Sequence, residues 1–185
     1  MLRNGKMILL LLLAVFLAGC SQKVESRTDN AFIAAKNAFE ANDKRANETI
    51  GDIKFHKPAT MKADKQSTSQ TVVLTKRNDS FYLTVNPNEK KDSRVYYDLL
   101  LTEEPENLIG AQTFAKDEAF GFIAVIQKSE NLVELIAGVG GARVETVTNE
   151  ENINSYLEKM MQIARSVQHE EQETGKITSK KGENL

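Results

Sequence analysis

The sequence predicts an α+β fold of two layers, in which two helices pack on an antiparallel sheet of about six strands. Apolar residues recur at helical spacing after residue 31 and again after residue 150, whereas the segments between them alternate with a period of two or are continuously apolar. The 185 residues are 27% charged and 41% apolar, which fits one globular domain. We therefore expect an N-terminal helix, the sheet and a C-terminal helix packed on it, together forming a single domain over residues 31–168.

The first helix is predicted over residues 31–48. Phe32, Ala35 and Phe39 follow at spacings of three and four, and Asp29-Asn30 before them offers N-cap side chains. A helix lying on a membrane surface is the alternative. The few bulky apolar residues and the mixed charges of this segment favour packing on a sheet.

The strand pattern recurs along the middle of the chain. Most of these segments alternate apolar and polar residues, and one is continuously apolar, as a central strand would be. The segments are Ile53–Phe55 (ended or edged by Pro58), Thr71–Thr75, Ser80–Val85, Val95–Leu101, Phe122–Ile126, Leu132–Val139 and Ala142–Thr148.

Two of these segments flank Gly140-Gly141, which predicts a tight hairpin because glycine accepts a positive φ without strain. Pairing across this turn puts Val133, Leu135, Ala137 and Val139 beside Thr148, Thr146, Val144 and Ala142. A phosphate-binding loop at Gly138–Gly141 is the alternative. The segment lacks the Lys-Ser/Thr ending of such a loop, and Arg143 stands where a dinucleotide fingerprint needs its third glycine.

The closing helix is predicted over residues 150–168, opened by a capping box at Thr148–Glu151. Its apolar residues recur at spacings of three and four, and they are Ile153, Tyr156, Leu157, Met160, Ala164 and Val167. Met160 and Met161 are expected in the core and at its edge. After Gln168 the apolar pattern stops, so residues 169–185 are predicted to be a disordered tail.

The polar side chains outside these elements are interpreted as ordinary surface residues. His56 and His169 are the only histidines, and no metal-ligand spacing surrounds either of them. Glu103, Glu104 and Glu106 could hold calcium, but they lack the alternating oxygen ligands of a dedicated loop. Lys57, Lys62 and Lys65 could face anionic lipid, and a charged loop is the simpler interpretation. No catalytic, cofactor-binding or metal-ligating residue is predicted, and the chain is not expected to be an enzyme.

Tyr82, Tyr96 and Tyr97 are the candidates for an aromatic contact surface. If residues 95–101 form a strand, alternation sends Tyr96 and Tyr97 to opposite faces and buries one of them. The exposed tyrosine of the pair would then be the best candidate to contact a partner, because tyrosine combines a large apolar area with a polar tip.

The first 22 residues contain an export signal. Arg3 and Lys6 precede the apolar run Met7–Ala18, which is too short to span a bilayer, and Leu17-Ala18-Gly19-Cys20 follows. This segment resembles the lipobox of bacterial lipoproteins. The resemblance implies a signal peptide over residues 1–19, cleavage between Gly19 and Cys20, acyl chains on the Cys20 thiol, and a lipidated tether over residues 20–30.

The order of elements over residues 50–168, with a glycine-bearing hairpin that leads into a closing helix, also resembles the PsbP-like fold and uncharacterised lipoprotein domains of Gram-positive bacteria. These folds host varied binding and accessory roles, so the resemblance implies a fold and no particular activity.

The expected function is that of a non-enzymatic binding or accessory module, held by its acyl chains on the extracytoplasmic face of the cell membrane, or on the outer membrane of a Gram-negative cell. Removal of residues 1–19, which hold two basic and no acidic residues, leaves 22 basic and 26 acidic residues and a net charge of about −4. This balance disfavours nucleic acid as a partner and leaves an envelope protein as the expected one. The alternatives are a carrier of lipid or a small apolar ligand, with a cavity between sheet and helices, and a hydrolase of unrecognised type.

Overall fold

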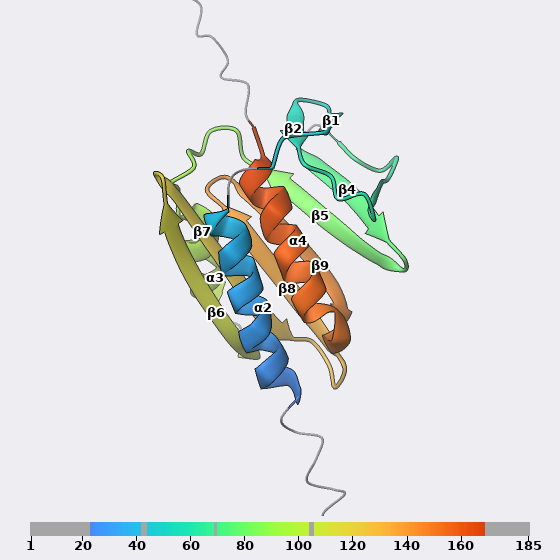
Figure 1. Cartoon of the computed structure of the whole chain (residues 1–185), viewed down its shortest axis with the longest axis vertical. Helices are drawn as coiled ribbons and strands as arrows, with labels where there is room; N and C mark the ends of the chain where they lie inside the picture. The colour runs from blue at the N-terminus through green and yellow to red at the C-terminus, as the bar shows by residue number, and fades with distance from the viewer. Residues whose placement is uncertain (1–22, 42–43, 69, 104–105, 169–185) are drawn as a thin grey trace, which may run out of the picture.

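The computed structural model describes residues 23–41, 44–68, 70–103 and 106–168. A seven-stranded antiparallel sheet with the order β3-β4-β5-β9-β8-β7-β6 forms its centre (Figure 1). The strands are β3 (Lys62–Ala63), β4 (Thr71–Lys76), β5 (Asp79–Val85), β6 (Leu108–Lys116), β7 (Ala119–Gln127), β8 (Leu132–Val139) and β9 (Ala142–Asn149). A separate two-stranded hairpin consists of β1 (Glu48–Ile50) and β2 (Ile53–Phe55).

Helices cover both faces of the large sheet, to different extents. The helices α2 (Lys23–Glu40) and α4 (Ile153–Ser166) lie side by side on one face, here called the inner face (Figure 1). The shorter helix α3 (Val95–Glu103) packs on the opposite, outer face. The predicted α+β class is confirmed, with an N-terminal helix, an antiparallel sheet and a C-terminal helix packed on it. The sheet has seven strands instead of about six, and α3 adds partial cover to its second face.

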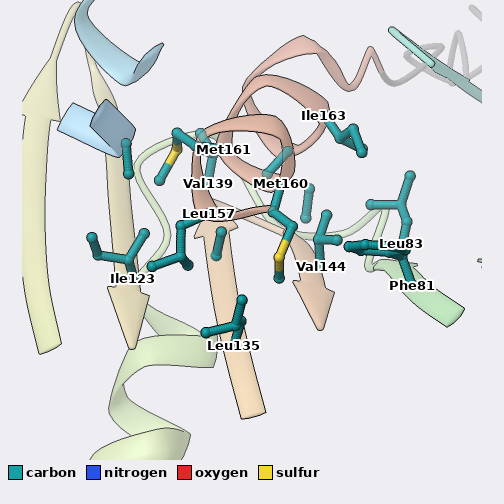
Figure 2. Close-up of a cluster of buried hydrophobic side chains, with 14 of the residues drawn as sticks. Phe81, Leu83, Ile123, Leu135, Val139, Val144, Leu157, Met160, Met161 and Ile163 are labelled. Atoms are coloured by element: carbon teal, nitrogen blue, oxygen red, sulfur yellow. The ribbon is translucent and has the colours of Figure 1, made fainter. Parts of the chain in front are cut away.

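The main core lies between α4 and the inner face of the sheet. Figure 2 shows Leu157 and Met160 of α4 directed at side chains of the central strands, among them Leu135 and Val144. All four of these side chains are completely buried. Met160 therefore lies in the core as expected, and Met161, expected at the edge of the core, is equally buried.

The hairpin of β8 and β9 has the predicted register, from Val133 opposite Thr148 to Val139 opposite Ala142. Gly140 adopts φ +53°, and a Cβ atom there would collide with the carbonyl oxygen of Lys90. Glycine is therefore required both by the turn and by the close approach of a neighbouring loop. The hairpin interpretation of this segment is confirmed.

The first helix begins and ends eight residues earlier than predicted, since it spans Lys23–Glu40 instead of 31–48. Residues 23–30, expected in the tether, are therefore helical. The buried stripe of the helix consists of Thr28, Ala31, Ala35 and Phe39. A polar threonine opens this stripe, so apolar periodicity alone misses the first turns.

The segment predicted as a strand at Val95–Leu101 is the helix α3, and the prediction was wrong. Nearly every residue there is apolar, so the alternate positions that indicated a strand also satisfy a helix. Local contacts favour the helix. The Ser93 hydroxyl accepts a hydrogen bond from the Val95 N–H at 3.3 Å, and Arg94 forms an ion pair with Asp98 one turn later.

Two further features of the chain differ from the predictions. The strand β6 was not predicted, because Leu108–Lys116 mixes small and polar residues without clear alternation. The predicted capping box is also absent at the start of the closing helix. A short 3₁₀ turn at Glu150–Asn152 precedes α4, and the Thr148 hydroxyl instead donates a hydrogen bond to Asp79 Oδ2 at 3.0 Å.

Candidate functional site on the outer face of the sheet

The outer face is only partly covered by α3. Leu100 of this helix packs with alternate residues of β7 and with Ile136 of β8. The Tyr97 ring lies 5.7 Å from the Phe120 ring and 5.6 Å from the Phe122 ring, measured between centroids. These contacts fix α3 over β7, while the outer sides of β9, β5 and β4 extend beyond it.

A groove of about 270 Å³ lies between α3 and the sheet. Its apolar wall consists of Leu100, Ile126 and Ile136, and the remaining lining is polar or charged: Tyr96, Glu103, Lys128, Glu134 and Arg143.

Both cations of the groove form ion pairs, Lys128 from the β7–β8 turn to β8 and Arg143 along β9. Lys128 Nζ lies 3.0 Å from Glu134 Oε2, and Arg143 forms an ion pair with Glu145. The groove therefore combines an apolar wall with neutralised ion pairs. An apolar group can pack against the wall while polar atoms at its edge bond to the paired charges.

Tyr96 lies at the Arg143 end of this groove. The Arg143 guanidinium is 5.9 Å from the centre of the Tyr96 ring. Burial raises the pKa of the Tyr96 hydroxyl, nearby Arg143 opposes this shift, and Glu89 and Glu145 add to it. Tyr96 is therefore neutral at physiological pH and can donate a hydrogen bond from its place in the groove.

The three predicted tyrosines all lie on the outer side of the sheet. Tyr82 of β5 is exposed and stands opposite Glu145 of β9. Tyr96 and Tyr97 are both half-buried, so the expectation that one faces the core and the other solvent was wrong. Its cause is the helical backbone, which places consecutive side chains about 100° apart and not on opposite faces.

Exposed large apolar side chains are concentrated on this same face. In the described part of the chain, Ile33 lies on α2, and the other seven such residues lie on α3 or at outer positions of the sheet. These seven, here called the outer apolar set, are Tyr82, Val95, Leu99, Leu101, Leu108, Leu132 and Val147. Apolar residues gathered on one face mark an interaction surface better than the same residues scattered singly.

The basic and acidic candidates of the loops lie apart from one another. Lys57 forms an ion pair with Glu48 at 2.6 Å, and the His56 N–H donates to the Ser166 hydroxyl at the end of α4. Glu103 lines the groove, and Glu106 is exposed beyond it. Among the described residues, no three His, Cys, Asp or Glu side chains gather where they could hold a metal ion.

Several sequence-predicted positions lie outside the described residues, namely Gly19, Cys20, Glu104, His169 and the tail 169–185. The lipidation and cleavage sites therefore remain predictions. None of the described helices is long and apolar enough to cross a bilayer.

Sequence reasoning missed the groove itself, because its wall α3 was assigned to a strand. A signal was present in β9, where Arg143, Glu145 and Val147 alternate with buried residues. Charged residues that alternate with buried ones indicate that one face of the strand is exposed. They do not indicate that α3 lies beside this face and forms a groove with it.

Comparison with known proteins gives a likeness of fold. No protein-family model matches the chain, and no curated protein matches it. The fold is similar to the solution structure of cyanobacterial PsbP (CyanoP) from Synechocystis sp. PCC 6803, with a TM-score of 0.44 and 13% sequence identity. The similarity covers 69% of this chain and 92% of that one.

Proposed function

We propose that this chain is an extracytoplasmic lipoprotein, anchored through Cys20, that acts as a non-enzymatic binding module and contacts a partner protein with its outer face. The observation that carries the proposal is the concentration of exposed apolar side chains on α3 and the adjoining strands. An isolated exposed leucine is ordinary, but seven large apolar residues on one face are not.

The composition of this face suits a protein partner. Tyrosine and arginine dominate the energetics of protein interfaces, and here Tyr82, Tyr96 and Arg143 accompany the leucines of α3. The groove gives a partner's apolar side chain a place to enter, and its ion pairs lie around that entry. The apolar set also continues past the groove onto Val147 and Tyr82, which favours an extended partner surface over a small ligand.

The packing of the inner layer weighs against the carrier alternative. A carrier needs an apolar space between helices and sheet. The groove under α3 is lined mainly by polar and charged residues, and the inner layer is occupied by completely buried side chains such as Leu157, Met160 and Ile163. An apolar ligand in this layer would have to displace them.

The anchor completes the proposal. The lipobox Leu17-Ala18-Gly19-Cys20 supports export and acylation. Confinement to a membrane raises the local concentration of the outer face for other envelope proteins without any new contact.

Site-specific photo-crosslinking in the native cell tests this proposal. A photoreactive residue replaces Leu99 of α3 in one variant and Ile33 of α2 in the matched control, since both are exposed apolar positions on helices, 44% and 60% exposed. We expect a discrete crosslinked protein from position 99 that is absent or much weaker from position 33. The same products from both positions, or none from position 99, would contradict a binding role for the outer face.

A further inference from the structure

We infer that the domain stands on the bilayer with the end that carries the α2 N-terminus and the β7–β8 turn against the lipid headgroups. This inference rests on the proposed anchor at Cys20 and adds to it which surface of the domain the membrane contacts. The direction of α2, the short segment between Cys20 and α2, and the side chains at this end of the domain support this orientation.

The direction of α2 is defined by two contacts along the sheet. The Phe32 ring lies 3.4 Å from the position of a Cβ atom on Gly110, near the start of β6, and the Phe39 ring lies 5.5 Å from the Phe114 ring, near its end. Helix α2 therefore runs parallel to β6. Its N-terminus lies at the end of the sheet where β6 and β8 begin and β7 ends, at the bottom of Figure 1.

The anchor and the domain are close in sequence. Helix α2 begins at Lys23, three residues after Cys20. Three residues span at most about 11 Å even when fully extended. The nine residues of β6 extend over roughly 30 Å. The anchor therefore holds one end of the domain near the bilayer, and the opposite end stays away from it unless the whole domain lies flat.

Side chains at this end suit the headgroup region. Leu108 and Leu132 are 38% and 39% exposed and begin β6 and β8. The β7–β8 turn, residues 128–131, is exposed and consists of Lys, Ser, Glu and Asn. These two leucines form the membrane end of the outer apolar set and can enter the interface, which leaves the other five for the partner protein. The charged turn keeps this end out of the hydrocarbon.

Fluorescence quenching at two positions of one strand tests the orientation. Leu108→Cys and Ala115→Cys each place a thiol on β6, at exposed positions of the same outer face and about 23 Å apart along the strand. The full-length precursor is expressed in its native cell, purified with its anchor, labelled with a maleimide fluorophore and reconstituted in phosphatidylcholine vesicles that carry a quencher on the headgroup. Leu132→Cys serves as a second membrane-side position in case the first variant folds poorly.

We expect quenching at residue 108, and at residue 132, to be several-fold stronger than at residue 115. Equal quenching at 108 and 115 would mean that the domain lies flat, and stronger quenching at 115 would mean that the opposite end faces the bilayer. Either result, or no quenching at any position in vesicle-bound protein, overturns the inference.

The wild-type chain separates failure of this inference from failure of the proposed anchor. Cys20 is its only cysteine, and acylation converts the thiol to a thioether that cannot react with maleimide. Wild-type protein without label therefore carries the anchor, and the quenching then tests orientation alone. One label per wild-type chain would contradict the anchor itself.

Discussion

A polar cluster joins the closing helix to the sheet at the level of single residues. The Tyr156 hydroxyl donates a hydrogen bond to Asp79 Oδ2 at 2.8 Å, and the same oxygen accepts one from Thr148. The Tyr156 ring is completely buried and meets the Phe81 ring edge-on, with centroids 4.9 Å apart. A buried hydroxyl without such a partner would cost stability, so Asp79 makes a tyrosine acceptable in this core.

Replacement of Tyr156 by phenylalanine is expected to lower the free energy of unfolding by about 1–3 kcal/mol, because the ring stays while the hydrogen bond is lost. Burial, together with the bond to Asp79, raises the pKa of Tyr156 to about 12, against an ordinary value near 10. The neutral tyrosine is therefore the form that the fold favours. The Tyr156 hydroxyl therefore contributes fully to the stability of the fold below about pH 10, and this contribution is lost as the pH rises towards 12.

Urea unfolding at neutral pH and between about pH 10 and 12 checks both the lost stability and its pH dependence. Tyr156→Phe should be less stable at pH 7 and should lose less stability than the wild type between about pH 10 and 12. The exposed Tyr82→Phe variant is the control and should keep the wild-type stability and pH profile. A Tyr156→Phe variant as stable as the wild type would show that the hydroxyl contributes nothing.

Sequence patterns predict the burial of single residues well where the apolar periodicity of a helix or strand determines it. Leu157, Met160 and Val144 were expected in the core and are buried there. The bond between Tyr156 and Asp79 could not be predicted, because it joins residues 77 positions apart whose proximity depends on the complete strand order. The capping box failed for the same reason, since its Thr148 hydroxyl donates to Asp79 Oδ2 and accepts a hydrogen bond from the Asn152 side chain at 2.9 Å.

At the level of elements, α4 and the β8–β9 hairpin are among those that were predicted closely. The apolar stripe of α4 and the glycine turn of the hairpin are strong local signals, and the rest of the fold does not change what they specify. Helix α3 was mistaken for a strand because its residues are apolar on every side, and such a run fits both periods. Strand β6 was missed because pairing with β7 specifies it more than its own side chains do.

The closing helix should contribute strongly to stability through Leu157. This side chain is completely buried against the sheet, so Leu157→Ala is expected to lower the free energy of unfolding by about 2–5 kcal/mol through lost burial and a cavity. Ile33→Ala, at a 60% exposed position of α2, should change it by less than about 0.5 kcal/mol. Chemical denaturation measures both, and equal midpoints for the two variants would contradict the packing described for α4.

At the scale of the whole molecule, the two faces of the sheet differ in how completely they are covered. Helices α2 and α4 bury the inner face, whereas α3 leaves a groove and much of the outer apolar set in solvent. Composition and periodicity predicted the sheet and the two packed helices. They could not predict this asymmetry, because it depends on α3 and on the position of β7 next to the edge strand β6.

The proposed anchor determines how the partly covered outer face is directed relative to the membrane. With the α2 N-terminus held near the bilayer, the strands rise from the surface and the outer face is directed sideways. A neighbouring envelope protein could then reach α3 without leaving the membrane surface.

Metabolic labelling with a fatty acid tests the anchor most directly. The wild type and Cys20→Ser are expressed in the native cell, and acyl incorporation and membrane association are measured for each. We predict that labelled fatty acid enters the wild type and that Cys20→Ser carries no label and leaves the membrane fraction. Equal labelling of the two chains, or a wild type without label, would contradict the account.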